Sequence, residues 1–429
     1  MELFKKLQEI QSREGYLPME ELEKLPCPMP RIISTASFYD YFRWEKCPQE
    51  SHIENLYPVQ KRGILLISDM DQMLSAMKKA AARPEEIIPE IKASLLRGRG
   101  GGGFPVWRKW ELVKNTAAGQ KYVVCNAGEG EPGTGKDRAL LTENPEAVIT
   151  GMAICAIAVG ADKGILYLRA EYGDLKASLE KAISSLPSEN IEIELCMGMG
   201  PYACGEETAL LESIEGNRGE PRDKPPLPGV SGLYGMPTVI NNAETFACVP
   251  YIIAKGAESF RKHGTETYPG TKLYTVSGCL LRPGIYELDA GTTAGELLAL
   301  AVSTAVPQAI QIGGGSGSIV YASALDLPLD ADSCLERGLS LGTGAVRFIG
   351  EDEDLREYVT KLAEFFAQES CGICVPCRNG LRELVRLLQD TEKSKAEIME
   401  LAQYIKKTSR CALGKSAVVP VISWLERWF

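Results

Sequence analysis

Four cysteines near the end of the chain constrain its fold more than any other feature. Cys371, Cys374 and Cys377 follow one another with two residues between each pair, and Cys411 lies in the later segment Ser-Arg-Cys-Ala-Leu-Gly. Four thiolates without histidine suit either a [4Fe–4S] cluster or a structural zinc ion. Three ligands packed into one loop favour the cluster over the paired knuckles of a zinc site. The sequence therefore predicts a C-terminal region organised around a metal centre.

Composition disfavours several other kinds of chemistry. The net charge is -10, whereas a protein that mainly binds nucleic acid needs a positive surface. The two histidines, His52 and His263, do not lie in any motif. Serine-triad hydrolases and most zinc hydrolases depend on histidine, so both classes are unlikely matches. Hydride transfer needs no protein base, so the scarcity of histidine does not argue against it. We therefore expect no catalytic side chain.

The chain is expected to be cytoplasmic. Its longest apolar run, at about residues 147–161, is shorter than the ~20 residues that span a membrane, and its N-terminus lacks an apolar signal segment. In a reducing cytosol, thirteen cysteines indicate metal ligands or buried thiols rather than disulfides. Most of the scattered cysteines are interpreted as core residues, and Cys27 and Cys47 are kept as a candidate second metal pair.

The residue pattern divides the chain into regions of different character. These are a helical segment and linker at 1–62, an α/β domain at 63–262, a small β-rich module at 263–345 and a helical domain at 346–429.

Candidate strands and helices alternate within the α/β region. The strands are expected at 63–67, 122–125 and 164–168, and each precedes a turn and a helical pattern. This alternation implies a mostly parallel sheet that is covered by helices. In the β-rich module, one helix is expected at 294–301.

A glycine-rich loop at residues 98–103 predicts a phosphate site. Consecutive glycines let backbone N–H groups approach phosphate closely, and Arg99 and Lys109 add positive charge. Gly98, Gly100 and Gly103 match the spacing G-x-G-x-x-G. No acidic residue follows at the end of a clear second strand, so the loop does not predict a Rossmann dinucleotide site.

A second glycine-rich segment, at residues 130–136, nearly fits the P-loop of nucleotide triphosphatases. Asp137 stands where that motif requires a hydroxyl for Mg²⁺, and Glu131 adds a second unfavourable charge. We therefore interpret the acidic residues here, with the pair Glu206 and Glu207, as acceptors for the hydroxyl and amide groups of a cofactor.

Taken together and in order, these motifs resemble one family. The glycine-rich loop, residues 125–138, 202–210 and 224–245, and the cysteine cluster resemble the NADH-binding flavoprotein subunit of respiratory complex I. Soluble NAD-linked hydrogenases, formate dehydrogenases and electron-bifurcating complexes have subunits of the same family. The resemblance covers about residues 63–429. It implies FMN, NAD(H), one [4Fe–4S] cluster, and a β-grasp (ubiquitin-like) module between an FMN-binding α/β domain and a C-terminal helical bundle that carries the cluster.

The resemblance also assigns residues. Gly98, Gly100 and Lys109 correspond to the flavin phosphate loop. The other implied flavin contacts are Asn126, Tyr202, Gly205, Asn241, Asn242 and Thr245. The implied nucleotide contacts are Glu129, Glu131, Glu207 and Lys224, with Phe104 stacking beside the adenine. The four cysteines correspond to the cluster ligands.

The family implies partners as well. The N-terminal residues, including 14–18 and 36–39, resemble the helical start of a thioredoxin-like [2Fe–2S] subunit, which is one expected partner. The others are a further iron–sulfur or catalytic subunit and, in bifurcating members of the family, ferredoxin.

This sequence departs from the family pattern at a few positions. Gly128 stands where an aspartate is usual, and Leu227 and Leu112 stand where aromatic residues are usual. A single phosphate loop favours FMN over FAD. Glu131 and Glu207 favour NAD(H) over NADP(H) by repelling the extra phosphate, whereas the basic residues Arg99, Arg108 and Lys109 leave NADP(H) as an alternative.

One alternative of another class is a non-catalytic scaffold that holds zinc at the four cysteines and carries no flavin. A visible spectrum separates the two hypotheses, because flavin and iron–sulfur groups absorb light and zinc does not.

Overall fold

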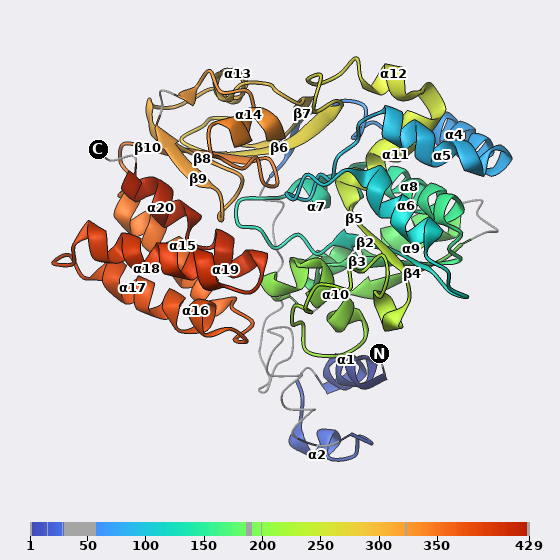
Figure 1. Ribbon diagram of the computed structural model, residues 1–429, viewed down its shortest axis with the longest axis horizontal. Helices are drawn as coiled ribbons and strands as arrows, with labels where there is room; N and C mark the ends of the chain where they lie inside the picture. The colour runs from blue at the N-terminus through green and yellow to red at the C-terminus, as the bar shows by residue number, and fades with distance from the viewer. Residues whose placement is uncertain are drawn as a thin grey trace.

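The computed structural model describes residues 2–14, 16–27, 29, 57–185, 191–198, 200–321 and 324–426. Within these residues the chain forms an α/β domain, a second module built on a separate sheet, and a group of C-terminal helices (Figure 1). Cys47, most of the expected linker at 46–62 and residues 36–39 lie outside the described residues.

A parallel sheet forms the centre of the α/β domain. Its strands are β2 (Tyr122–Ala127), β3 (Lys163–Leu168), β4 (Glu192–Met197) and β5 (Thr238–Asn242), in the order β4-β3-β2-β5. The strands predicted at 122–125 and 164–168 are confirmed. Both are mostly buried, because helices cover the two faces of the sheet, and their sequences are accordingly continuous apolar runs.

One face of this sheet is covered by long helices. The helices on this side are α4 (Met70–Ala82), α5 (Pro84–Ala93), α6 (Val106–Asn115), α8 (Pro145–Val159) and α11 (Ala243–Lys255). The apolar run noted in the sequence is α8, a buried core helix. At Gly151, a Cβ would overlap the backbone of Phe246, so glycine allows α8 and α11 to pack closely.

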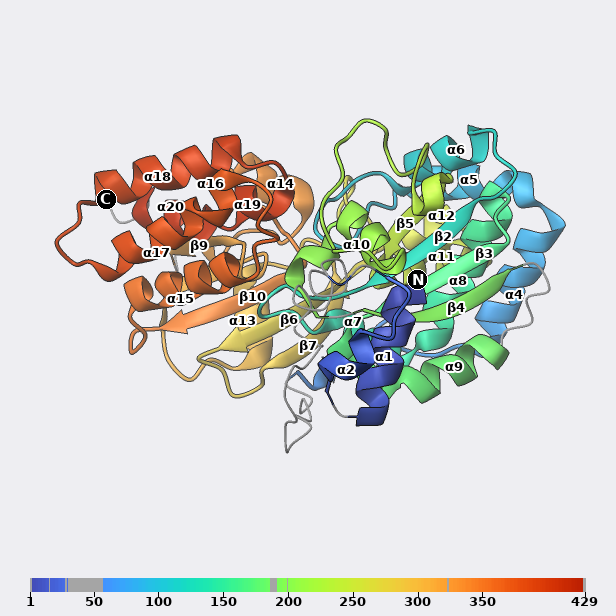
Figure 2. The ribbon, with the colours of Figure 1, turned by 90° about the horizontal axis from the view of Figure 1, so that it is seen from below.

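Two other helices cover the opposite face. They are α1 (Glu2–Glu14) and α10 (Glu207–Ile214), whose apolar residues belong to one cluster with those of the sheet (Figure 2). Leu7 and Ile10, from the face predicted in the sequence, pack with Val124 and Ile165. The N-terminal helix therefore belongs to the core of the α/β domain.

The strand order fixes where a ligand can bind. The chain moves from β2 outward to β3 and β4, and then returns to place β5 on the other side of β2. In open parallel sheets, ligands bind where the order reverses, beyond the carboxyl ends of the two strands. The parallel register pairs Asn126 with Asn242 at that point.

The second module is a mixed sheet of six strands. They are β1 (Val59–Lys61), β6 (Thr271–Gly278), β7 (Gly284–Asp289), β8 (Pro307–Ile312), β9 (Ser318–Tyr321) and β10 (Ala345–Gly350), in the order β1-β7-β6-β10-β8-β9. The hairpin β6–β7 and the central parallel pair β6–β10, with α13 (Ala294–Ala301) packed on the sheet, form a β-grasp arrangement. The helix predicted at 294–301 is confirmed, and α14 (Ala331–Glu336) lies nearby.

Two expected boundaries are corrected by this sheet. β1 lies in the segment expected to be a linker, and β10 lies in the region expected to be helical, yet both pair with strands of the module. β1 has three residues, too few to show an alternating pattern, so only its pairing with β7 identifies it as a strand.

The strand predicted at 63–67 is wrong. This segment is a turn. Its backbone N–H groups donate hydrogen bonds to the Glu287 carboxylate of β7 rather than to the carbonyl groups of a neighbouring strand. Gly63 N and Leu65 N lie 2.8 Å from its oxygens, and Leu66 N lies 3.0 Å away. One buried side chain thus joins the start of the α/β domain to the six-stranded sheet.

The C-terminal region is helical, as predicted. Its helices are α15 (Leu355–Gln368), α16 (Val375–Arg378), α17 (Gly380–Gln389), α18 (Lys395–Thr408), α19 (Ala412–Ser416) and α20 (Val419–Glu426). In α17, Leu381, Leu384 and Leu388 form a buried stripe at helical spacing. The cysteine loop interrupts the helices between α15 and α16.

Shorter elements complete the described chain. They are α2 (Met19–Leu22), α7 (Lys136–Glu143), η1 (Ala170–Leu175), α9 (Lys176–Ser185), η2 (Tyr202–Gly205), η3 (Leu233–Gly235) and α12 (Ala257–Phe260).

Replacing Glu287 by Ala should destabilise the protein strongly. The variant leaves three backbone N–H groups without an acceptor, and each buried unpaired group costs about 1–3 kcal/mol. We expect the free energy of unfolding to fall by about 3 kcal/mol or more, measured by urea denaturation followed by circular dichroism. Glu400→Ala, at an exposed position of α18, is the control and should change it little. Equal effects of the two variants would contradict this role of Glu287.

Candidate functional site

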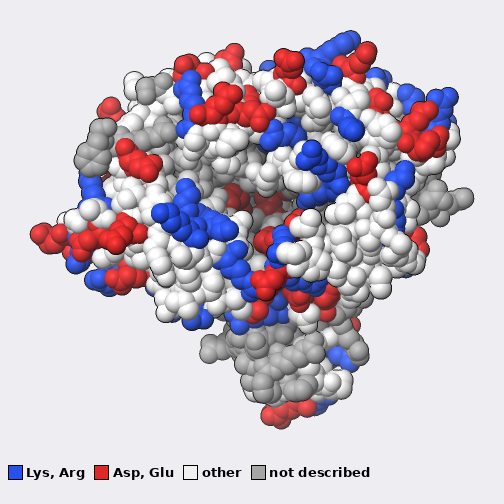
Figure 3. All heavy atoms as spheres, in the orientation of Figure 1, with Lys and Arg blue, Asp and Glu red and all other residues white. Residues whose placement is uncertain are grey.

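Two adjoining cavities lie between the α/β domain and its neighbours. Their volumes are about 510 Å³ and about 370 Å³. Gly100, Asn126, Asn242 and Ala412 line both, so the two form one continuous hollow. In Figure 3, the corresponding face is hollowed near its centre, with acidic side chains inside and basic side chains on the rim.

Every predicted cofactor-binding residue except Arg99 lines this hollow. Those in the larger cavity are Gly98, Gly100, Phe104, Lys109, Asn126, Glu206, Glu207, Lys224, Asn241, Asn242 and Thr245. Those found only in the smaller cavity are Glu129, Glu131, Tyr202 and Gly205.

The glycine-rich loop is closed by its own hydrogen bonds and by α11. Gly98 N–H donates to the Phe104 carbonyl at 2.9 Å, and Arg99 N–H donates to Thr245 Oγ1 at 2.9 Å. The loop turns at Gly103, whose φ of +58° lies in the left-handed region that favours glycine. The loop is therefore held in place at the start of α11, beside the carboxyl end of β5.

The middle of the loop fits a phosphate. Within the described part of the chain, no hydrogen bond engages the N–H groups of Gly100, Gly101 or Gly102. A Cβ at Gly100 would lie 3.0 Å from Cβ of Asn242, so glycine keeps the loop close to the strand ends. Backbone N–H groups beside the Lys109 ammonium are the donors that an anionic group requires.

The structure corrects the prediction that Arg99 contacts a cofactor. Its side chain is 1% exposed and turns away from both cavities. The guanidinium lies 4.3 Å from the centre of the Tyr268 ring and donates to the Pro269 carbonyl at 2.5 Å. This arginine instead stabilises the interior by a cation–π contact.

Three asparagines at the strand ends are held by hydrogen bonds within the protein. Asn241 Oδ1 accepts from Trp110 Nε1 at 3.1 Å, and Asn126 Nδ2 donates to the Gly205 carbonyl at 3.0 Å. Asn242 makes more contacts, since its amide oxygen accepts from Lys136 at 2.9 Å and its amide nitrogen donates to Asp137 at 2.6 Å. Their amide groups are therefore fixed before any ligand binds.

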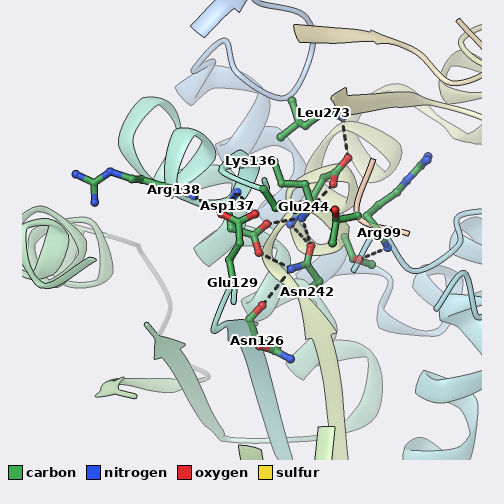
Figure 4. Close-up of polar contacts among 12 residues, drawn as sticks. Arg99, Asn126, Glu129, Lys136, Asp137, Arg138, Asn242, Glu244 and Leu273 are labelled. Carbon is green, nitrogen blue, oxygen red and sulfur yellow. Dashed lines mark hydrogen bonds and ion pairs between the residues drawn. The ribbon is translucent and has the colours of Figure 1, made fainter. Parts of the chain in front are cut away.

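A buried charge network lies behind Asn242 (Figure 4). Lys136 Nζ is 2.6 Å from Asp137 and 3.3 Å from Glu244, and Lys272 Nζ is 2.6 Å from Glu244. All four side chains are at most 2% exposed. Burial lowers the pKa of Lys272 to about 8, whereas the two carboxylates outweigh burial and raise that of Lys136.

Glu129 and Glu131 belong to the smaller cavity and also hold the fold. Glu129 accepts from the N–H of Asp137 at 3.0 Å and from Tyr172 Oη at 3.0 Å, and burial together with Asp137 raises its pKa to about 7. Glu131 accepts from Tyr202 Oη and from the N–H of Ser316, both at 2.6 Å. Burial raises the pKa of Glu131 as well.

Glu207 lies between two lysines at the larger cavity. Its carboxylate is 3.0 Å from Lys109 Nζ and 2.7 Å from Lys224 Nζ. Burial favours the neutral acid, but the two ammonium groups outweigh it and lower the pKa of Glu207. Glu206 has a different task, because its carboxylate caps the first turn of α10 and binds Lys224 at 2.9 Å.

The apolar wall of the larger cavity includes Phe104, Leu112 and Leu227. Phe104 and Leu227 are about half exposed, at 48% and 50%. The two leucines noted as departures from the family pattern thus lie beside the predicted adenine contact.

The six-stranded module contributes residues that the sequence did not reveal. Gly313, Ser316, Ser340, Gly342 and Thr343 line the smaller cavity. Three consecutive glycines at 313–315 are the one local feature of this segment, and the sequence alone does not connect them with the acidic loop at 130–132. Gly315 N–H donates to the Pro132 carbonyl at 2.9 Å and so joins the two loops.

The four predicted cluster ligands come together in one region. Cys371 and Cys377 are buried in the core of the C-terminal helices, and Cys374 and Cys411 pack against it. Burial raises the pKa of Cys377 to about 12, and the three other thiols add to this rise. The loop is held by Arg218 and Arg378, which donate to the carbonyls of Cys371 and Gly372 at 2.6 and 2.7 Å.

This donor set fits an iron–sulfur cluster. The thiolates of a [4Fe–4S] cluster each bind a different iron, so four cysteines from one loop and one helix start suit the cluster chemistry.

None of the described helices combines the length and the apolar character that crossing a bilayer takes.

Comparisons with known proteins agree with this arrangement. A family model described as the Nuo51 FMN-binding domain matches residues 91–251, and one described as the NADH-ubiquinone oxidoreductase-F iron–sulfur binding region matches residues 357–429. The chain is 41% identical to the alpha subunit of the NAD-reducing hydrogenase of Cupriavidus necator, over 88% of this chain and 64% of that subunit. It is 40% identical to a subunit of the NADH-quinone oxidoreductase of Rhizobium meliloti, over 82% of this chain and 90% of that protein.

A solved structure has the same fold. A chain of an NAD⁺-reducing [NiFe]-hydrogenase in its H₂-reduced state matches with a TM-score of 0.81 and 36% identity, over 87% of this chain and 66% of that chain. This chain therefore spans slightly less than two thirds of the length of these two NAD-reducing hydrogenase chains.

The matches confirm the predicted fold class, the FMN-binding domain and the iron–sulfur region. The two curated relatives named above are subunits of oxidoreductases. The chain belongs to the family of FMN- and iron–sulfur-binding flavoprotein subunits that occur in NADH-quinone oxidoreductases and NAD-reducing hydrogenases.

Proposed function

We propose that this chain transfers hydride between NAD(H) and FMN and passes electrons singly to a [4Fe–4S] cluster held by Cys371, Cys374, Cys377 and Cys411. The observation that carries the proposal is the continuity of the hollow. One cavity contains the glycine-rich loop, the other contains the acidic loop, and Ala412, which follows Cys411 directly, lines both. A cofactor held in the hollow would thus contact the residue that follows a proposed cluster ligand in the sequence.

The residues of the hollow divide the work of binding. The N–H groups of Gly100–Gly102 and the Lys109 ammonium bind the phosphate of FMN, and the fixed amides of Asn126 and Asn242 orient the rest of the molecule. Bound FMN supplies the capacity to take up a hydride and to release electrons one at a time, which no protein side chain has.

The nucleotide is held by carboxylates and by the apolar wall. Lys109 and Lys224 keep Glu207 ionised, so its oxygens accept hydrogen bonds from nucleotide hydroxyl or amide groups at neutral pH. Phe104, Leu112 and Leu227 offer an apolar surface for the adenine. The negative charge of Glu207 favours NAD(H), because it repels the extra phosphate of NADP(H). Arg108 also lines the larger cavity, and it is the basic residue that would bind that phosphate if the chain used NADP(H).

We also propose that the chain works in the cytoplasm within a complex. Its partners are a thioredoxin-like [2Fe–2S] subunit and a further iron–sulfur or catalytic subunit. If the same site serves electron bifurcation, ferredoxin is a further partner. NADH-dependent reduction of ferredoxin by the purified complex would distinguish a bifurcating complex from one that does not bifurcate electrons.

Each of the four cysteines should be needed for the cluster. Anaerobically purified protein is expected to contain about four irons per chain, and the Cys→Ala variants at 371, 374, 377 and 411 should lose most of them while keeping flavin. Cys279→Ser, at a partly buried cysteine outside the cluster loop, is the control and should keep its iron. Metal analysis measures both, and zinc in place of iron would support the scaffold alternative.

The bound flavin should be FMN. The structure offers one glycine-rich phosphate loop, and its cavity of about 510 Å³ is shared with the nucleotide wall. Flavin released by acid and separated by chromatography should therefore run with authentic FMN. Recovery of FAD would refute the assignment of the loop.

Glu207→Gln should weaken the binding of NADH without releasing the flavin. Losing a charged hydrogen bond costs about 1.5–3 kcal/mol, which lowers the affinity by about one to two orders of magnitude. Anaerobic titration with NADH, and separately with NADPH, follows reduction of the flavin absorbance. Glu111→Gln, on the exposed side of α6, is the control. A normal NADH response in Glu207→Gln, or a wild type that prefers NADPH, would overturn this placement of the nucleotide.

A further inference from the structure

Ser409 is a buried serine near the cluster loop that none of the assignments above explains. It follows the last residue of α18 and precedes Cys411 by two positions. Its side chain is 4% exposed, and among the described residues its hydroxyl has no hydrogen-bond partner. A buried hydroxyl without a partner is unfavourable, so its position calls for an acceptor that the polypeptide does not provide.

The surroundings of Ser409 place its hydroxyl near a proposed cluster ligand. A Cβ at Gly414 would overlap the Ser409 hydroxyl and would lie 3.1 Å from Cβ of Cys377. Ser409 and Cys377 therefore share the small space that glycine leaves free at position 414. The hydroxyl is thus beside one of the proposed cluster ligands and close in sequence to another, Cys411.

A second serine, Ser370, contacts Cys377 directly. Ser370 Oγ lies 3.2 Å from Cys377 Sγ, and it also accepts from the N–H of Gly372 at 3.3 Å. Since Ser370 accepts from a backbone group, its own proton is free to be donated to sulfur. Ser370 already has its sulfur partner, whereas Ser409 has none within the described polypeptide.

We propose that the Ser409 hydroxyl donates a hydrogen bond to a sulfur atom of the bound cluster and thereby raises the reduction potential of the cluster. One-electron reduction adds one negative charge to the cluster and its thiolates. A hydrogen bond to sulfur stabilises the more negative form more strongly, and such bonds are among the factors that set cluster potentials. Ser409 is a positioning and tuning residue, and its role rests on the proposed ligand set.

The test is a redox titration of the cluster, followed by its electron paramagnetic resonance signal, in the full chain. In Ser409→Ala, we expect the ratio of reduced to oxidised cluster at a fixed potential to fall about tenfold, which is about 59 mV for one electron. The flavin potential should not change. Thr408→Val is the matched control, because the neighbouring Thr408 hydroxyl is exposed and bonds to the Tyr404 carbonyl of its own helix.

The outcomes separate the two levels of the proposal. A wild type without a cluster would refute the proposed function itself. A normal cluster whose potential is the same in Ser409→Ala would refute the role of Ser409 alone. If Ser409→Ala binds no cluster, Ser409→Thr is the deciding variant, because it retains the hydroxyl. A cluster with the wild-type potential in Ser409→Thr supports the hydrogen bond. Loss of the cluster in Ser409→Thr shows that the position serves packing only.

Discussion

The arrangement of the whole site depends on the buried charges around Lys136. Lys136 and Asp137 begin α7, Glu244 lies in the first turn of α11, and Lys272 lies on β6 of the second sheet. Removing charges from water is costly, and it is tolerated only where partners and hydrogen bonds satisfy each group. Because these charges pair across elements, the network fixes α7, α11 and the six-stranded sheet relative to one another.

The same network reaches the site through Asn242. Lys136 and Asp137 hold the two ends of its amide group, and the parallel register places Asn242 opposite Asn126 at the reversal of strand order. These hydrogen bonds hold Asn242 in one orientation at the hollow. Thr245 binds the glycine-rich loop, and the glycine loop that begins at Gly313 binds the acidic loop.

Charge is distributed unevenly across the hollow. At the larger cavity, Glu207 is kept ionised by two lysines, whereas burial raises the pKa of Glu129 and Glu131 at the smaller one. Carboxylates of the same type therefore differ in their tendency to stay charged, because the lysines beside Glu207 outweigh its burial. The ionised Glu207 thus lies at the cavity that contains the glycine-rich loop, where the phosphate and the nucleotide are proposed to bind. The two carboxylates with raised pKa lie at the cavity next to α19.

The sequence by itself determined features that depend on neighbouring residues. The glycine-rich loop lies in the hollow and the apolar face of α1 lies in the core, as predicted. The spacing of the cysteines predicts the ligands of the proposed cluster, and the structure brings the four residues into one region. Only the tertiary structure decided the features that join distant segments. The turn at 63–67 depends on Glu287, more than 200 positions away, and Arg99 is drawn inward by Tyr268. β1 and β10 become strands through pairing. Contacts with residues far away in the sequence set these outcomes, and the residues next to each segment do not reveal such contacts.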